Sequence, residues 1–205
     1  MFSDQVLQML ADVLPILKRY EKQCAVGGAV AMGIQGAPRA TMDLDVFILD
    51  KCRSRILYDI RKLGYQIIPV FEPFHYAAYP RWRTADIDPE VRIDLLFPAD
   101  DIEVAGIERA EDVTVGRGKA AFSVRVFSPL FLTLSKLYSS QGKHLIDLGM
   151  MFNRGMIPMD EVLQILKDND PDMVKKFLAR IKFIERRLTD KPRPKFKTLK
   201  KGNRK

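Results

Sequence analysis

Three acidic residues combine a residue type and a spacing that are suited to binding metal ions. Asp43 and Asp45 are separated by one residue within the stretch 43–49, whose apolar and β-branched residues predict a strand. Because residues i and i+2 of a strand point to the same side, the two carboxylates are expected roughly 7 Å apart on one face. They repel each other there unless a cation lies between them. The alternative is a pair of solvated acids near the end of a strand.

A third acid, Asp94, lies in a second predicted strand over residues 90–97, in which apolar and polar residues alternate. If the two strands are neighbours, three carboxylates converge, and such hard oxygen ligands select Mg²⁺ or Mn²⁺. Two ions held in this way can stabilise both the attacking and the leaving oxygen of a phosphoryl transfer. Asp86 and Asp88 are nearby alternatives, but only Asp94 lies within a stretch of clear alternation.

A pair of glycines, Gly27 and Gly28, follows a short apolar stretch and precedes a predicted short helix over residues 29–34. Without side chains, these residues let backbone N–H groups approach a phosphate closely, and a helix N-terminus favours anions. The alternative is that the two glycines only form the turn between strand and helix.

The predicted elements describe an α/β region followed by helices. An amphipathic helix is predicted over residues 4–22, within which Pro15 predicts a kink or a break. The further predictions are an apolar stretch at 24–26, a helix at 53–64, a strand at 66–71, a hairpin within 113–127, and helices near 129–140, 143–153, 159–168 and 172–188. The sequence therefore predicts an α/β domain over residues 1–127, a helical domain over 128–190 and a tail over 191–205.

The net charge of +8 is concentrated at one end of the chain. The tail holds eight of the 34 Lys and Arg residues and no acid, so the other residues balance 26 bases against 26 acids. This composition predicts a basic, disordered tail. Together with the basic last helix, it favours contact with RNA or DNA, whereas a solvated basic face is the alternative.

Length and apolar content exclude several classes of protein. With 205 residues, of which 47% are hydrophobic, the chain can bury a core, which excludes disorder of the whole protein. No apolar run approaches the ~18–20 residues that span a bilayer, and the N-terminal residues lack the features of a signal peptide. Cys24 and Cys52 have neither metal-site spacing nor a disulfide framework. We therefore expect a cytoplasmic protein with reduced thiols and no membrane partner.

The order and spacing of these motifs resemble the nucleotidyltransferase superfamily related to DNA polymerase beta. Its members combine an apolar residue, Gly-Gly or Gly-Ser, a short helix, Asp-x-Asp and a third Asp on a separate strand. The segment Gly36-Ala-Pro-Arg-Ala-Thr-Met-Asp-Leu-Asp45 is especially similar to the abortive-infection (AbiEii-type) toxin branch of the minimal nucleotidyltransferases. The resemblance covers roughly residues 20–150. It implies a mixed-sheet nucleotidyltransferase domain followed by a C-terminal helical bundle.

The resemblance also implies the residues of a site. Asp43, Asp45 and Asp94 would be the catalytic residues and the ligands of two Mg²⁺ ions that hold the triphosphate. Asp94 would also take the proton from an acceptor hydroxyl, whose oxygen attacks the α-phosphorus of the nucleotide. Gly27 and Gly28 would contact phosphate oxygens.

The resemblance also assigns three further residues to nucleotide binding, namely Arg39, Thr41 and Lys136. Arg39 and Thr41 directly precede the acids; Arg39 would pair with a phosphate through its planar guanidinium, or alternatively neutralise the acids. In this branch a helix after the catalytic domain carries a Lys that meets the phosphates, and Lys136 fits that position. The branch often continues with Lys/Arg-Asp-x-x-Asp, but the segment Lys143-His-Leu-Ile-Asp147 retains only Asp147 of the two acids.

The implied function is metal-dependent transfer of a nucleoside monophosphate from a nucleoside triphosphate, such as ATP, to a hydroxyl group. A toxin-like protein would act on the end of an RNA or tRNA or on a protein, and would have an antitoxin partner; a small molecule such as an antibiotic is another acceptor. The alternative is a catalytically inactive regulator of the same fold that binds nucleotide or nucleic acid. Retention of all three acids favours the enzyme.

Two histidines lie outside these motifs. His75 belongs to the aromatic-rich stretch 71–82, which is interpreted as a lid or as satellite core, with base stacking as the alternative. His144, at the start of a predicted helix, is interpreted as a surface or capping residue.

Overall fold

Seven strands form one mixed sheet at the centre of the protein, in the order β3-β4-β5-β2-β1-β7-β6. The computed structural model describes residues 2–81, 91–116, 118, 121–138 and 142–189. The strands are β1 (Cys24–Val26), β2 (Asp43–Ile48), β3 (Gln66–Phe71), β4 (His75–Tyr79), β5 (Arg92–Leu96), β6 (Glu111–Val115) and β7 (Phe122–Val126). The expected α/β class is confirmed. The predicted tail over 191–205, Asp86 and Asp88 lie outside the described residues.

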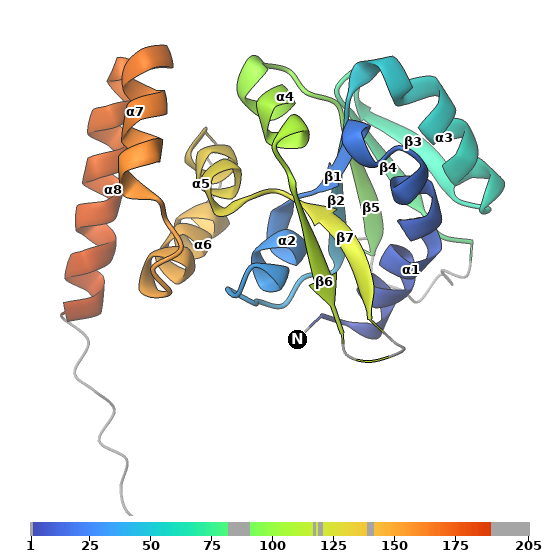
Figure 1. The fold of residues 1–205 in the computed structure, drawn as a ribbon, viewed down its shortest axis with the longest axis horizontal. Coiled ribbons are helices and arrows are strands. Elements are labelled where there is room, and N and C mark those ends of the chain that lie inside the picture. Colours follow the sequence, from blue (N-terminus) through green and yellow to red (C-terminus); the bar gives the residue numbers. More distant parts are fainter. Residues whose placement is uncertain (1, 82–90, 117, 119–120, 139–141, 190–205) are drawn as a thin grey trace, which may run out of the picture.

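Helices cover both faces of this sheet (Figure 1). They are α1 (Asp4–Arg19), α2 (Gly28–Ile34), α3 (Arg53–Lys62), α4 (Asp101–Glu108), α5 (Pro129–Tyr138), α6 (Gly142–Asn153), α7 (Met159–Asn169) and α8 (Pro171–Thr189). Figure 1 shows α1 and α3 on one side of the sheet, with α2, α5 and α6 on the other. The sheet is therefore a central layer, and its two faces have different neighbours.

Strand β2 lies near the middle of the sheet, antiparallel to β1 and parallel to β5. Its residues Leu44, Val46 and Ile48 are buried in the core, as expected for one face of a strand. Asp43 and Asp45 alternate with these apolar residues and are only half-buried, on the opposite face. The alternation predicted from the sequence thus separates the core from the acids.

The first helix begins and ends close to its predicted limits. The Ser3 side chain accepts a hydrogen bond from the N–H of Val6, which caps the N-terminus of α1. The helix continues through Pro15 to Arg19, so the alternative of a break at this proline is wrong. A short 3₁₀ turn, Glu21–Gln23, then leads into β1.

Two elements were not predicted. Strand β4 lies within the stretch interpreted as an aromatic loop, and α4 follows β5 in a segment to which no element was assigned. Because β4 pairs with β3 on one side and β5 on the other, neighbouring strands determine its conformation. Asp100 caps the N-terminus of α4, because its side chain accepts a hydrogen bond from the N–H of Glu103.

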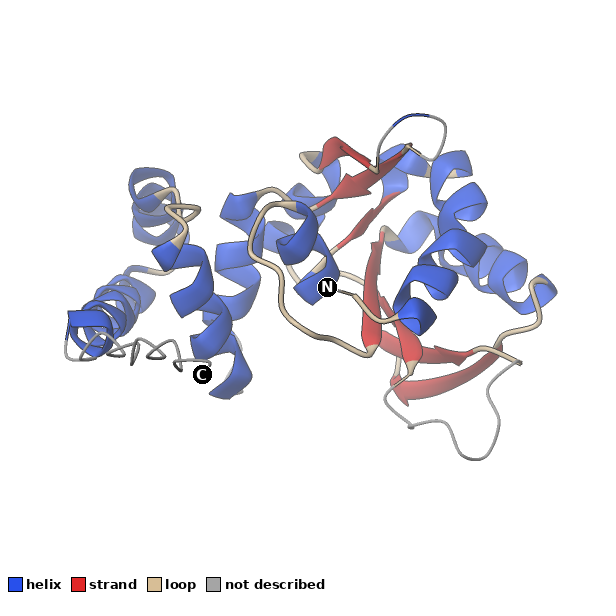
Figure 2. Cartoon of the chain, turned by 90° about the horizontal axis from the view of Figure 1, so that it is seen from below, coloured by secondary structure: helices blue, strands red, loops and turns tan. Residues whose placement is uncertain are grey.

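The C-terminal helices lie beside the sheet (Figures 1 and 2). Helix α5 packs against α6, and α7 packs against α8. Buried side chains of these helices join the same hydrophobic core as those of the sheet, among them Leu132, Leu148, Val162 and Phe177. No helix in the described part of the chain is both long and apolar enough to cross a membrane.

Candidate active site

The three predicted acids meet on one face of the sheet. In the parallel pair of β2 and β5, Asp45 lies directly opposite Asp94, and Asp43 lies opposite Arg92. Asp43 shares a face with Asp45 because the two residues are two positions apart on one strand. One carboxylate oxygen of each acid lies within 4.8 Å of the others. The expected convergence is therefore present in the structure.

The electrostatic state of Asp45 differs from that of an ordinary carboxylate. Burial, together with the negative charges of Asp43 and Asp94, raises the pKa of Asp45 to about 7, against an opposing effect of Lys136 and Lys143. The raised pKa means that the surrounding side chains do not neutralise the charge of Asp45. A cation placed among them would relieve both the repulsion and the burial of charge.

Asp94 is stabilised as an anion by neighbouring donors. Its Oδ1 lies 2.9 Å from Nε2 of His75 and 2.8 Å from Nε of Arg92. Burial alone would raise the pKa of Asp94, but the hydrogen bonds from His75 and Arg92 outweigh it and hold the pKa below its ordinary value. The described contacts of this carboxylate are all made by Oδ1.

The two glycines pack tightly against strand β2. A Cβ at Gly28 would lie 1.6 Å from Oδ2 of Asp45, and Gly28 has a φ of 57°, which side chains rarely adopt. A Cβ at Gly27 would lie 2.4 Å from the ring of Phe47. The N–H of Gly27 donates to the backbone carbonyl of Asp45. Both glycines are therefore required by close packing around Asp45, whatever else they contact.

A cleft with a volume of about 330 Å³ opens over the acids. Its floor includes Gly28 and the three aspartates, and Lys136, from α5, and Lys143, from α6, contribute positive charge to its lining. The remaining described lining residues are Ala29, Arg39, Phe47, His75, Arg92, Leu96, Glu103, Ser135 and His144. Neither Gly27 nor Thr41 is among the described residues that line it.

Thr41 and Arg39, which the resemblance assigns to nucleotide binding, each contact an acid. The buried hydroxyl of Thr41 donates to Oδ1 of Asp43, so this side chain orients a carboxylate. Nε of Arg39 lies 2.6 Å from Oδ1 of Asp147, an acid of α6, and not beside Asp43 or Asp45. The alternative in which Arg39 neutralises the Asp-x-Asp acids therefore does not match its contact.

Two cations that line the cleft, Arg39 and Lys136, contact Asp147, which is not itself among the described lining residues. This residue is fully buried, and its Oδ2 lies 2.7 Å from Nζ of Lys136, which is only 3% exposed. Burial would raise the pKa of Asp147, but the charges and hydrogen bonds of Lys136 and Arg39 outweigh it and lower the pKa. Asp147 thus holds two of the predicted phosphate-binding cations in place.

Several cleft residues were missed or misread from the sequence. His75 lies on strand β4 and contacts Asp94, whereas the stretch around it was interpreted as a loop. His144 is half-buried in the cleft and not a surface residue, and burial, followed by the charge of Lys136, lowers its pKa to about 4. Glu103 belongs to the unpredicted α4. For Lys143, the retained Lys143-x-x-x-Asp147 spacing could have indicated its place in the cationic lining, to which Lys136 and Arg39 were already assigned.

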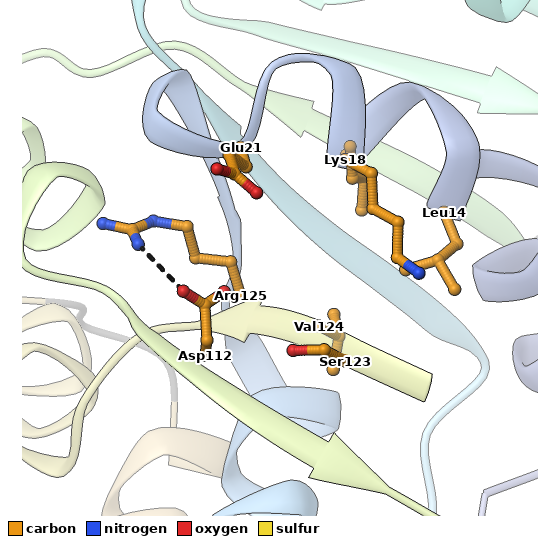
Figure 3. Close-up of a pocket in the computed structure, with 8 residues that line it drawn as sticks. Leu14, Lys18, Glu21, Asp112, Ser123, Val124 and Arg125 are labelled. Atoms are coloured by element: carbon orange, nitrogen blue, oxygen red, sulfur yellow. Dashed lines mark ion pairs between the residues drawn. The ribbon is translucent and has the colours of Figure 1, made fainter. Parts of the chain in front are cut away.

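A second cavity, of about 150 Å³, lies between α1 and the β6–β7 hairpin (Figure 3). Here the charges are mixed: Lys18 and Glu21 come from the α1 side, and Arg125 lies 3.5 Å from Asp112. Arg125 also donates to the backbone carbonyl of Glu108. Unlike the cleft over β2, this cavity has no group of three converging acids among its described lining residues.

Solved structures with a similar fold are nucleotidyltransferases. The chain aligns with an antigenic nucleotidyltransferase-like protein from Paracoccidioides brasiliensis at 16% identity and a TM-score of 0.53, covering 92% of each chain. A proposed nucleotidyltransferase from H. pylori aligns at 20% identity and a TM-score of 0.52, covering 88% of this chain and 84% of the other. The antibiotic-resistance factor ANT(2'')-Ia aligns at 13% identity and a TM-score of 0.50, covering 89% and 96%. These likenesses show a nucleotidyltransferase fold.

A sequence comparison defines the family more closely. The family model described as "Nucleotidyl transferase AbiEii toxin, Type IV TA system" matches residues 15–202. The chain therefore belongs to the AbiEii nucleotidyltransferase toxin family, which confirms the resemblance drawn from its motifs. A search of curated proteins finds no match.

Proposed function

We propose that this protein transfers a nucleoside monophosphate from a nucleoside triphosphate to a hydroxyl group in a Mg²⁺-dependent reaction. The observation that carries the proposal is the meeting of Asp43, Asp45 and Asp94 at the floor of a cleft whose opposite wall is cationic. The acids are suited to hold cations, and the wall is suited to hold phosphates. Family membership supports the same reaction class.

The residues present fit magnesium. Three carboxylates offer hard oxygen ligands within 4.8 Å of one another, and the raised pKa of Asp45 reflects its burial and the neighbouring charges of Asp43 and Asp94. Asp43, Asp45 and Asp94 would hold the metal. Bound Mg²⁺ supplies positive charge that neutralises the triphosphate and polarises its phosphoryl oxygens.

The protein's own side chains would position the reactants and take up the proton. The acceptor oxygen forms a bond to the α-phosphorus while the bond from that phosphorus to the bridging oxygen breaks, and pyrophosphate leaves. The ionised carboxylate of Asp94, whose Oδ1 accepts hydrogen bonds from His75 and Arg92, would also accept the hydroxyl proton. Lys136, Lys143 and Arg39 would bind phosphate oxygens, with Asp147 orienting two of them.

The test compares nucleotide binding and transfer in matched variants. With radiolabelled ATP, CTP, GTP or UTP and total RNA, the wild type is expected to form labelled product only with Mg²⁺. Asp43→Asn/Asp45→Asn is expected to lower Mg²⁺-dependent nucleotide binding and transfer by more than about 1,000-fold. Asp50→Asn, an exposed acid just beyond β2, is the control and should retain both. Unchanged binding and transfer in the double variant would refute the mechanism, and binding without transfer in the wild type would favour the inactive regulator.

We further propose that the acceptor is the end of an RNA, such as a tRNA, which contacts α8. Lys175, Lys176, Lys182, Arg186 and Arg187 are exposed on this helix, and the basic residues of 191–205 follow it in the sequence. Such a surface suits a phosphate backbone. A chain shortened after Asp190 should bind oligonucleotide with a smaller salt dependence; an unaltered dependence would exclude the tail from binding.

Because the family is described as part of a type IV toxin–antitoxin system, an antitoxin is the proposed protein partner.

A further inference from the structure

We propose that His75 is a positioning residue that fixes the carboxylate of Asp94 in the orientation needed for metal binding. The inference rests on the proposed function, because it assigns a task to a neighbour of one proposed metal ligand. His75 does not belong to the Gly-Gly or Asp-x-Asp motifs, and it lies on strand β4, which the sequence did not predict.

The contact is specific in both distance and direction. Nε2 of His75 lies 2.9 Å from Oδ1 of Asp94, and the histidine side chain is only 24% exposed. In the antiparallel pairing of β4 with β5, Ala77 lies opposite Asp94. His75 is two residues from Ala77 and therefore points to the same face of the sheet as the acids. The alternation of β4 thus brings the imidazole to the edge of the cluster.

One oxygen of Asp94 receives both donors. Nε of Arg92 lies 2.8 Å from the same Oδ1, so two donors from adjacent strands hold this oxygen. A carboxylate is otherwise free to rotate about its last bond, and Asp43 and Asp45 repel it. Anchoring Oδ1 from two directions prevents that rotation and leaves Oδ2 for the cation. Hydrogen bonds to ligating side chains commonly determine metal affinity in this way.

The alternative role for His75 is structural, in which its hydrogen bond to Asp94 only helps to join strands β4 and β5. This alternative explains the contact less well than a role in positioning Asp94. Strands β4 and β5 already pair through their backbones from His75 opposite Leu96 to Ala78 opposite Ile93. The imidazole is therefore not needed to join the strands. Its hydrogen bond acts on a side chain that the proposed reaction uses.

The experiment compares two polar replacements that differ in reach. The amide nitrogen of His75→Gln lies near the position of Nε2, whereas the shorter side chain of His75→Asn cannot reach Asp94. Mn²⁺ binding, measured by electron paramagnetic resonance without nucleotide, provides a readout that does not depend on turnover. Tyr76→Phe, which alters the opposite face of the same strand, is the control, and thermal melts show that each variant is folded.

We expect His75→Asn to weaken Mn²⁺ binding about 10- to 100-fold, with His75→Gln and Tyr76→Phe within about threefold of the wild type. In the transfer reaction, His75→Asn should lower kcat at saturating nucleotide, and His75→Gln should restore it. Equal Mn²⁺ affinity in His75→Asn and the wild type would overturn the inference. If that variant binds normally while Asp43→Asn/Asp45→Asn does not bind, only the inference fails. If the wild type binds no Mn²⁺, the proposed function fails with it.

Discussion

Asp45 lines the cleft, whereas Asp147 is fully buried and contacts two cations that line it, and the pKa values of the two aspartates shift in opposite directions. Burial and the charges of two other aspartates raise the pKa of Asp45 to about 7. Asp147 contacts Lys136 and Arg39, and its pKa falls below the ordinary range. The carboxylate of Asp45 on the sheet thus lacks a neutralising cation, whereas the carboxylate of Asp147 on α6 is neutralised by Lys136 and Arg39.

This difference distinguishes an acid that is available to bind a cation, Asp45, from an acid whose charge is already paired within the protein, Asp147. A buried charge that is paired within the protein stabilises the fold that pairs it, whereas an acid without such pairing, here Asp45, is stabilised as an anion by an added cation. The sheet wall should therefore gain stability from a metal or from loss of an acid. The helical wall should lose stability when its acid is removed.

The largest expected effect comes from Asp147→Asn. This change leaves Lys136 buried without its carboxylate partner and should lower the free energy of unfolding by about 3–5 kcal/mol. Urea unfolding followed by circular dichroism measures the loss. Lys136→Met added to Asp147→Asn should recover part of it, because the uncompensated ammonium is removed. A loss below about 1 kcal/mol for Asp147→Asn would mean that the two walls do not differ as described.

A change of opposite sign is expected for Asp45→Asn. Because the folded-state pKa of Asp45 is raised from 3.8 to about 7, the folded protein binds this proton more tightly than the unfolded chain. Its contribution to stability is thus present at low pH and is lost as pH rises between about 4 and 7. Without metal, the variant should equal the wild type near pH 4 and exceed it at pH 8 by on the order of 2 kcal/mol.

The control for this prediction is Mg²⁺. Asp94 and Asp147 have lowered pKa values, so their contributions to the stability of the fold are lost as pH falls, which is the opposite direction. Both proteins share these contributions. The quantity to measure is therefore the difference in the free energy of unfolding between variant and wild type at each pH. Saturating Mg²⁺ should reverse that difference at pH 8 by stabilising only the wild type. A difference that does not change with pH would contradict the assignment of the raised pKa.

The smallest change in the free energy of unfolding is expected for a substitution in the cavity between α1 and the β6–β7 hairpin (Figure 3). Asp112 is 59% exposed, and its carboxylate lies 3.5 Å from Arg125. Asp112→Asn should change the free energy of unfolding by less than about 0.5 kcal/mol, because exposed ion pairs contribute little. Transfer activity should be unchanged. A loss of activity here would place a functional site on the α1 side of the sheet.

The elements that carry the acids could be predicted because their signals are local. The alternation in β2 and β5 and the glycines before α2 are visible within a few residues. Helix α4 was missed although it carries a readable signal: Asp100 followed three residues later by Glu103 is typical of a helix N-terminus. Strand β4 has no comparable signal, because its pairing with two neighbours defines it.

Contacts between distant segments could not be predicted. Arg39 and Asp147 are 108 residues apart, and no pattern near either residue indicates that they form an ion pair. The same applies to His75 and Asp94, which meet only because β4 and β5 are adjacent. Motif spacing therefore identified the acids, and tertiary pairing determined which donors and cations surround them.

The parallel pairing of β2 with β5 has a consequence during protein synthesis. A nascent chain that stops before β5 carries Asp43 and Asp45 but lacks Asp94 and one of the two neighbours of β2. Since parallel strands pair only after the intervening crossover has been made, the third carboxylate arrives only when β5 joins β2. Translation products that end before β5 would consequently be unable to assemble the acidic triad.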